Sequence, residues 1–392
     1  MENLLKRLAI LALATFWLLG ITAASGVTPG SSSGNPDVAP TTSPKKTIPA
    51  KPTPRKTTPA HGTVARSRRV QNPWRLSSYA DPGADDNPAG DDPVIRQVAV
   101  DALGKVSGSV VVVDPNTGRI LSIVNQKLAL SSGFTPCSTI KPVVALAALR
   151  EGIITPTTKL YVGNHTRVDL TDALARSNNV FFNKLGLMLG FRRITEYAEE
   201  FGFGEKAGLD IPGESAGRYP SAPPRQGGVG FLAYCGTDMD VTPLQMAAVI
   251  STIANGGTLY ALQYPRTPEE LASFQPVVRR RLDDLAEYIP QIREGLAGTV
   301  LYGTGRSAYD PDLSIYGKTG TCSENGARLG WFISYAGNLQ SQYVVVVFLR
   351  GGRMMYGPHA AEIAGHFYRD LMQKEHPTQA HREESSFVSP GR

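Results

Sequence analysis

Three short runs contain the residue types that acyl transfer requires. In chain order they are Ser138-Thr139-Ile140-Lys141, Ser177-Asn178-Asn179 and Lys318-Thr319-Gly320-Thr321. A serine hydroxyl is a weak nucleophile until a neighbouring base takes its proton, and a lysine can be that base if burial and a nearby cation lower its pKa. Each run alone is a common pattern. Their joint occurrence in this order predicts a serine acyl-transfer site.

The first run fits the beginning of a helix. Pro142 is tolerated only in the first turn, so the helix is expected to begin within a few residues of Ser138. Ser138 and Lys141 are three residues apart and therefore share a helical face. Taken alone, the same pattern more often marks a capping serine and a solvated lysine.

The second and third runs add polar groups suited to a substrate peptide. Ser177 can relay a proton, and the amide of Asn179 can bind a peptide group, although a simple Ser/Asn helix cap is the alternative. In Lys318-Thr319-Gly320-Thr321 the lysine supplies positive charge and the glycine permits close approach to the backbone. The two threonine hydroxyls suit a carboxylate. An ordinary surface strand is the alternative for this run.

The elements around these runs are predicted from hydrophobic periodicity and turn residues. Strands are expected at Ser109–Val113, Arg119–Val124, Ser314–Cys322, Leu329–Tyr335 and Gln342–Arg350. Helices are expected at about Lys141–Glu151, Leu170–Leu189, Thr242–Ala254 and His359–Gln373. Strands from both ends of the chain around a helical middle predict an α/β fold, with a sheet domain and an all-helical subdomain.

The two ends of the chain are expected to lie outside the folded domain. Lys6 and Arg7 precede an uncharged run of 17 residues, Leu8–Ala24, which is long enough to span a membrane. We favour an uncleaved anchor over a cleaved signal, with the basic pair in the cytoplasm and the catalytic domain outside it. The expected divisions are an anchor or signal at 1–27, a disordered Pro/Thr/Ser-rich linker at 28–92, the folded domain at 93–373 and a disordered tail at 374–392.

Charge is unevenly distributed along the 392 residues. The formal net charge is +6, from 40 Lys and Arg against 34 Asp and Glu. Nine of these basic residues lie in the expected linker: Lys45, Lys46, Lys51, Arg55, Lys56, Arg66, Arg68, Arg69 and Arg75. The remaining 31 basic residues nearly balance the acidic ones. A nucleic-acid partner is therefore not expected for the folded part.

Further blocks extend the pattern beyond the three runs. They are Val111–Leu121, Phe201–Gly204, Gly208–Glu214, Val241–Ala247 and Ala254–Gly257. With the runs, they make the chain resemble the penicillin-binding protein transpeptidase domain family from roughly Pro93 to Gln373. The resemblance implies a β-lactamase/transpeptidase-like fold, in which helices flank an antiparallel sheet. The family's large N-terminal pedestal domain is expected to be missing here, with the linker in its place.

The resemblance also implies a role for each motif residue. Ser138 would attack the bond between two D-alanines of a peptidoglycan stem peptide, and Lys141 would accept its proton. Ser177 and Lys318 would help to return a proton to the leaving D-alanine. The backbone N–H groups of Ser138 and Thr321 would form the oxyanion hole.

The remaining roles concern the substrate and the inhibitors of this family. Thr319 and Thr321 would hold the substrate's terminal carboxylate, beside Gly320, and Asn179 would bind its peptide group. Stem peptides, β-lactam antibiotics, the membrane and cell-wall synthesis proteins are the expected partners. We expect no cofactor and no metal.

The three cysteines lie close to the motifs in the sequence. Cys137 precedes the predicted nucleophile, Cys322 follows Thr321, and Cys235 lies in a loop that the resemblance brings near the site. Small buried thiols are the favoured interpretation. A disulfide between Cys137 and Cys322 is the alternative, because an exported chain meets an oxidising compartment.

Other functions remain open from the sequence alone. One is a serine hydrolase, either a β-lactamase or a D,D-carboxypeptidase. Glu214 is the candidate deacylating base for a class A β-lactamase, but it lies in a Pro-Gly-Glu turn that resembles the transpeptidase family. A non-catalytic penicillin-binding sensor or scaffold is a further alternative, although no motif residue is lost.

Overall fold

The computed structural model describes residues 76–131, 133–337 and 342–375. The expected anchor, most of the expected linker and all but the first two residues of the expected tail lie outside these residues; residues 374 and 375 end α11. Within them, no helix is both long and apolar enough to cross a membrane. The α-helices are α2 (Pro93–Leu103), α3 (Gln126–Leu130), α4 (Lys141–Arg150), α5 (Leu170–Ala175), α6 (Asn179–Glu200), α7 (Gly228–Cys235), α8 (Pro243–Ala254), α9 (Pro268–Ala272), α10 (Ile289–Leu301) and α11 (Gly357–Glu375).

The remaining regular elements are strands and short 3₁₀ helices. The strands are β1 (Gly108–Val113), β2 (Ile120–Val124), β3 (Leu160–Gly163), β4 (Thr166–Val168), β5 (Thr258–Ala261), β6 (Val277–Arg281), β7 (Ile315–Glu324), β8 (Ala327–Ala336) and β9 (Tyr343–Gly351). The 3₁₀ helices are η1 (Cys137–Ile140) and η2 (Arg306–Ala308).

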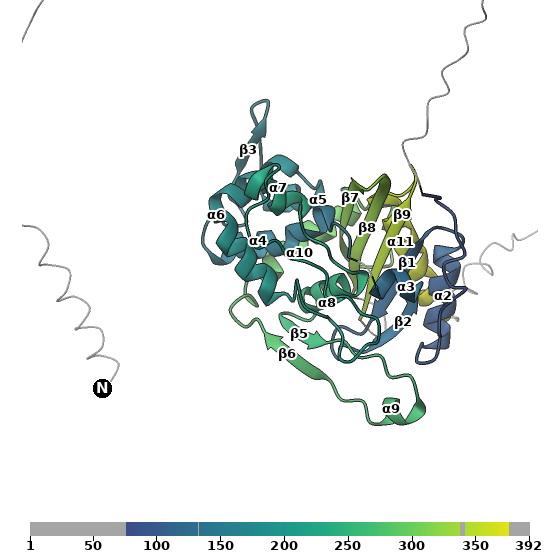
Figure 1. The fold of residues 1–392 in the computed structure, drawn as a ribbon. Coiled ribbons are helices and arrows are strands. Elements are labelled where there is room, and N and C mark those ends of the chain that lie inside the picture. Colours follow the sequence, from purple (N-terminus) through teal and green to yellow (C-terminus); the bar gives the residue numbers. More distant parts are fainter. Residues whose placement is uncertain (1–75, 132, 338–341, 376–392) are drawn as a thin grey trace, which may run out of the picture. The chain divides into compact units, whose positions relative to one another are not determined.

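One antiparallel sheet forms the centre of the domain. Its strand order is β2-β1-β9-β8-β7, and every neighbouring pair is antiparallel. The hairpin β1–β2 from the beginning of the domain pairs with β9 near its end, with Val110 opposite Val347. The predicted α/β fold with an antiparallel sheet is confirmed, because strands from both ends of the chain share this sheet (Figure 1).

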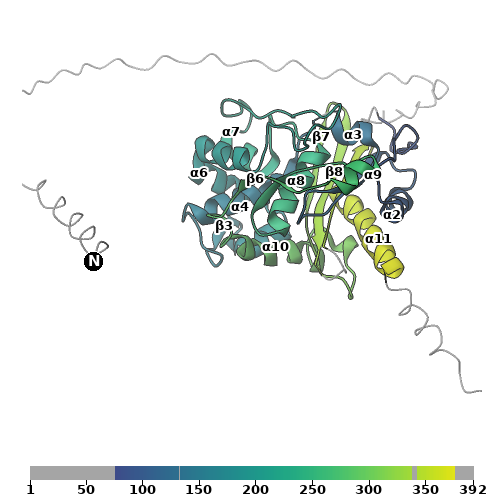
Figure 2. The same cartoon turned by 90° about the horizontal axis from the view of Figure 1, so that it is seen from below.

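Helices cover both faces of the sheet, which explains the valine-rich sequences of β1 and β9. Strand residues alternate in direction, so Val110 and Val347 pack with α2 and α11, whereas Val111 and Val346 pack with α8. A strand that is buried on both faces reads as a continuous apolar run. Figure 2 shows α2 and α11 on one side of the sheet and α8 on the other.

A helical subdomain lies beside the β7 edge of the sheet, as Figure 1 shows. It contains α4, α5, α6, α7 and α10, and α10 contacts β7. The helix α4 is buried on all sides from Lys141 to Leu149, which accounts for its lack of an amphipathic stripe. The helix predicted at Thr242–Ala254 is confirmed as α8, and Thr242 closes its first turn in a capping box with Gln245.

One expectation about the helical middle is wrong. The single helix predicted at Leu170–Leu189 is two helices, because Ser177 has φ 54° and interrupts the chain between α5 and α6. A left-handed residue cannot continue a right-handed helix. The middle of the chain also contains the small hairpins β3–β4 and β5–β6, which helical periodicity did not predict.

Residues 76–92 differ from the expected disordered linker, because they pack on the domain. Ser78 accepts from Ser107 N–H and from Gly352 N–H, at 3.0 Å in both cases. The guanidinium of Arg96 on α2 donates to Asp86 at 3.0 Å and to Asp91 at 2.7 Å. These two carboxylates are 4% and 1% exposed, so the segment contributes a largely buried ionic cluster to the fold.

The Asp86→Ala substitution is expected to lower the free energy of unfolding by about 3 kcal/mol, because it unbalances a buried charge cluster. It also removes the acceptor for Asn125 N–H and Gln126 N–H, each at 2.8 Å. Denaturant unfolding would measure the loss. The neighbouring exposed Asp85 provides the control, since Asp85→Ala should change stability by less than about 0.5 kcal/mol. Equal effects from the two substitutions would contradict a structural role for this segment.

Candidate active site

The first motif lies where the 3₁₀ helix η1 leads into α4. Ser138 is in η1, and Lys141 begins α4 with Pro142 in its first turn. The hydroxyl of Thr139 donates to the Pro136 carbonyl at 2.6 Å and tightens this turn. The expectation that a helix begins within a few residues of Ser138 is therefore confirmed.

The side chain of Lys141 joins the first motif to the second. It is 0% exposed, and its Nζ donates to Asn179 Oδ1 at 2.7 Å, to the Ser177 carbonyl at 2.8 Å and to Ser177 Oγ at 3.0 Å. Its ammonium also lies 5.4 Å from the centre of the Phe182 ring. In its ammonium form, Lys141 thus holds the two runs together through three hydrogen bonds that one buried nitrogen donates.

The break between α5 and α6 is what brings Ser177 and Asn179 to Lys141. The middle residue, Asn178, is the cap of α6, and its Oδ1 accepts from Phe181 N–H at 2.9 Å. The alternative interpretation of this run, a simple helix cap, is therefore correct for Asn178. The residues on either side of it contact Lys141 instead.

The third motif provides a second buried lysine on β7. Lys318 is 0% exposed, and its Nζ donates to the Thr319 carbonyl at 3.1 Å. Burial lowers the pKa of Lys318 to about 7. Burial also lowers the pKa of Lys141, to about 6, with a further contribution from the positive charge of Lys318. A large part of the Lys141 population is therefore neutral at pH 7.

The rest of the third motif is tied to segments that sequence reasoning missed. The hydroxyl of Thr319 shares a hydrogen bond with Thr304 at 2.5 Å, and Thr321 Oγ1 accepts from Gly357 N–H at 2.8 Å. Gly320 lies so close to the Pro136 carbonyl that a Cβ would approach it to 3.0 Å. Thr304 and Gly357 belong to no motif in the sequence. Only tertiary packing brings them to β7, so sequence reasoning could not identify them.

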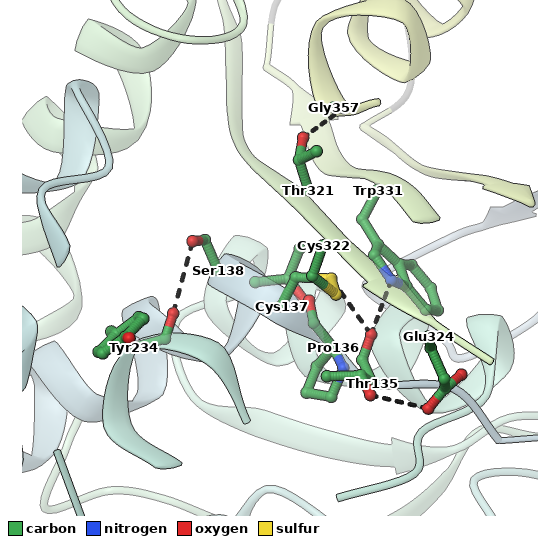
Figure 3. The surroundings of a disulfide bond; sticks show 11 residues. Thr135, Pro136, Cys137, Ser138, Tyr234, Thr321, Cys322, Glu324, Trp331 and Gly357 are labelled. Atoms are coloured by element: carbon green, nitrogen blue, oxygen red, sulfur yellow. Dashed lines mark hydrogen bonds between the residues drawn. A yellow bond between two sulfur atoms is a disulfide. The ribbon is translucent and has the colours of Figure 1, made fainter. Parts of the chain in front are cut away.

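The serine hydroxyl lies beside α7, another element that the motifs did not predict. Ser138 Oγ donates to the Tyr234 carbonyl at 3.4 Å, and Figure 3 shows the hydroxyl directed away from Cys137. That distance is long for an O–H···O hydrogen bond, so turning the hydroxyl elsewhere costs little. The ring of Tyr234 lies 6.0 Å from Lys141 Nζ, which places α7 against both residues of the first motif.

These motifs lie in the part of the chain that matches a known family model. Residues 108–373 match the penicillin-binding protein transpeptidase domain. The chain belongs to this family. Among curated relatives, stage V sporulation protein D of Bacillus subtilis is 30% identical over 288 residues, which cover 64% of this chain and 44% of the relative. Peptidoglycan D,D-transpeptidase FtsI of Escherichia coli K12 is 26% identical over 304 residues, 66% of this chain and 50% of the relative.

Solved structures agree with the fold of the transpeptidase domain. The transpeptidase domain of Burkholderia pseudomallei penicillin-binding protein 3 gives a TM-score of 0.63 at 21% identity, covering 75% of this chain and 97% of that one. The D,D-transpeptidase domain of a peptidoglycan glycosyltransferase from Eggerthella lenta gives 0.61 at 22% identity, covering 72% and 82%. The present chain spans about half the length of the curated relatives it matches.

The cysteines of this transpeptidase domain differ from the favoured expectation. Cys137 and Cys322 form a disulfide, with their Cα atoms 5.7 Å apart, so the interpretation as two free buried thiols is wrong. Sequence could not decide this, because the two residues are 185 positions apart. Cys235 is a free thiol, and burial raises its pKa. In the described part of the domain, no cluster of His, Cys, Asp or Glu could hold a metal ion.

Replacing Lys318 by methionine is expected to raise the pKa of Lys141 above its present value of about 6, because a neighbouring positive charge is lost. Methionine is apolar and of similar length, so burial of Lys141 is retained. The pKa would be measured by nuclear magnetic resonance on lysine labelled with ¹³C at Cε.

The exposed Lys374 serves as the control, and Lys374→Met should leave the pKa of Lys141 unchanged. An unchanged or lowered pKa in Lys318→Met would show that the two ammonium groups do not interact.

Proposed function

We propose that this chain is a serine D,D-transpeptidase that cross-links peptidoglycan stem peptides through an acyl-enzyme on Ser138. The main support is the contact of one buried, largely neutral lysine with the second motif, inside a domain of the transpeptidase family. The proposal includes covalent inhibition by β-lactams, which would acylate Ser138 as substrate mimics. It requires no cofactor.

In the first half-reaction, neutral Lys141 accepts the proton of Ser138 while Oγ attacks the carbonyl of the penultimate D-alanine. Burial supports this role for Lys141, because it disfavours the ammonium form and leaves a lone pair available near neutral pH. The resulting oxyanion is stabilised by the backbone N–H groups of Ser138 and Thr321. Oriented donors of this kind usually make the largest single contribution to such catalysis.

Collapse of the tetrahedral intermediate expels the terminal D-alanine, whose nitrogen must gain a proton. The hydrogen bond between Lys141 Nζ and Ser177 Oγ, at 3.0 Å, supports a relay in which Lys141 returns the proton through Ser177. Lys318 assists by keeping the local potential positive. An amine from a second stem peptide then attacks the acyl-enzyme and forms the cross-link, which regenerates the Ser138 hydroxyl.

The substrate is held on either side of the reacting bond. Thr319 and Thr321, on either side of Gly320, bind its terminal carboxylate with their hydroxyls. The exposed residue Asn179 binds a peptide group of the stem through its amide N–H₂, since its oxygen already accepts from Lys141. A single membrane pass in residues 1–27, with the catalytic domain outside the cytoplasm, would bring this site to the cell wall and to its synthesis proteins.

The position of Glu214 favours the transpeptidase over a class A β-lactamase. Its carboxylate accepts from Ala207 N–H at 2.6 Å and from Gly208 N–H at 3.0 Å, and the residue is 5% exposed. Both oxygens are engaged with backbone, since Oε2 also lies 3.0 Å from Gly208 N. A carboxylate fixed in this way closes its own turn and is poorly placed to activate a deacylating water.

An exchange assay on the full-length chain tests the proposal. With a stem peptide ending in D-Ala-D-Ala and a D-amino-acid acceptor, we expect release of D-alanine together with the exchanged peptide. Ser138→Ala should reduce both products by at least about 10³-fold, as loss of a serine nucleophile does elsewhere. Ser221→Ala, at an exposed serine, is the matched control and should retain wild-type rates.

Two results of this assay would contradict the proposal. Release of D-alanine without any exchange product would identify a carboxypeptidase. Undiminished product from Ser138→Ala would remove Ser138 from the nucleophile's role.

A further inference from the structure

The Cys137–Cys322 disulfide joins the two segments that carry the proposed oxyanion donors. Cys137 immediately precedes Ser138 in η1, and Cys322 immediately follows Thr321 on β7. Figure 3 shows the disulfide between η1 and β7, with Ser138 next to Cys137 and Thr321 next to Cys322. The cross-link is therefore one residue away from each donor.

The backbone at Cys137 is in a conformation that needs support. Its φ is 54°, in the left-handed region that a residue with a Cβ adopts at a cost of about 1–2 kcal/mol. Such residues persist only where the surrounding structure holds them, and they cluster at functional sites. Together with the ψ of Cys137, this φ sets the direction of the following peptide N–H, which belongs to Ser138.

The hydrogen bonds that join the residues before η1 to β7 and β8 act farther from Ser138. Trp331 Nε1 donates to the Thr135 carbonyl at 3.0 Å, and Thr135 Oγ1 donates to Glu324 Oε1 at 2.9 Å. Thr135 lies three residues before Ser138, with the left-handed Cys137 between them. These bonds hold Thr135 against the sheet. They do not fix the peptide between Cys137 and Ser138, which depends on other contacts.

We propose that the Cys137–Cys322 disulfide is a positioning element that sets the spacing of the oxyanion hole. It acts through Ser138 and Thr321, by holding their backbone N–H groups at the separation that one oxyanion can bridge. The inference rests on the proposed function, since it assumes that these two N–H groups bind the oxyanion. Oxyanion donors must lie within about 2.7–3.1 Å of the oxygen, so small displacements of either segment weaken both bonds.

If this is so, the acylation rate depends on the disulfide, whereas the affinity of initial binding does not. Misplacement of a catalytic group by about 1 Å can cost about 100-fold in rate. Opening the disulfide should therefore slow acylation, whereas carboxylate contacts on β7 persist and initial binding is retained. A disulfide that only stabilises the fold would leave the acylation rate of the folded protein unchanged.

The test measures acylation of the full-length chain by a fluorescent penicillin under single-turnover conditions. Cys235→Ala is the reference chain, because Cys235 lines the same cavity as Cys322 and its thiol could exchange with the disulfide. Cys137→Ala and Cys322→Ala are then added together. We expect the first-order acylation constant to fall about 10- to 100-fold, with the dissociation constant of the initial complex within about 2-fold of the reference.

A stability control separates positioning from folding. Leu371→Ala opens a cavity on α11, in the core on the other face of the sheet, and should lower the melting temperature without slowing acylation. Reduction of the reference chain by a phosphine should reproduce the slow acylation, and reoxidation should restore it. The double alanine chain should not respond to either treatment.

Three results would overturn the inference. They are an unchanged acylation constant in the double alanine chain, an equal slowing by Leu371→Ala, and loss of the native circular dichroism spectrum on reduction. The last two would assign the disulfide to stability alone. A reference chain that penicillin does not acylate at Ser138 would instead refute the proposed function, and mass spectrometry of the labelled peptide distinguishes that failure from the others.

Discussion

The removal of two lysine ammonium groups from water is the constraint on which the rest of this site depends. An isolated buried ammonium is costly, so it loses its proton or finds partners. Lys141 does both, because its pKa falls to about 6 and its nitrogen contacts Ser177 and Asn179. Lys318 is equally buried and adds its charge to the same region. Burial thus makes a base of Lys141, and the positive charge that Lys318 keeps despite its own burial lowers the pKa of Lys141 further.

The fold buries both lysine side chains through the elements that carry them. The helix α4 is enclosed on all sides, so its first residue, Lys141, is enclosed with it. The break between α5 and α6 then supplies oxygen acceptors at the enclosed nitrogen. Lys318 reaches the site from β7, which is fixed by pairing with β8 and by packing against α10.

Much of the fold and most of the motif residues could be predicted from sequence, because their signals are local. The valine-rich strands, the helix that begins near Pro142 and the helix that begins at Thr242 are examples. The contacts of Thr304, Tyr234 and Gly357 could not be predicted, since they depend on segments that meet only in the folded chain. The left-handed φ of Ser177 was also missed, because helical periodicity continues across it. The disulfide was not the favoured interpretation, because the spacing of Cys137 and Cys322 in the sequence gives no distance between them.

The central claim is that neutral Lys141 activates Ser138, and the pH dependence of acylation tests it most directly. The measured quantity is the first-order rate constant for acylation of the wild-type chain by penicillin, from pH 4 upwards. Protonated Lys141 cannot accept a proton, so the rate should rise with pH and reach half its maximum near pH 6. A rate that keeps rising towards the ordinary lysine pKa of about 10.4 would contradict the account.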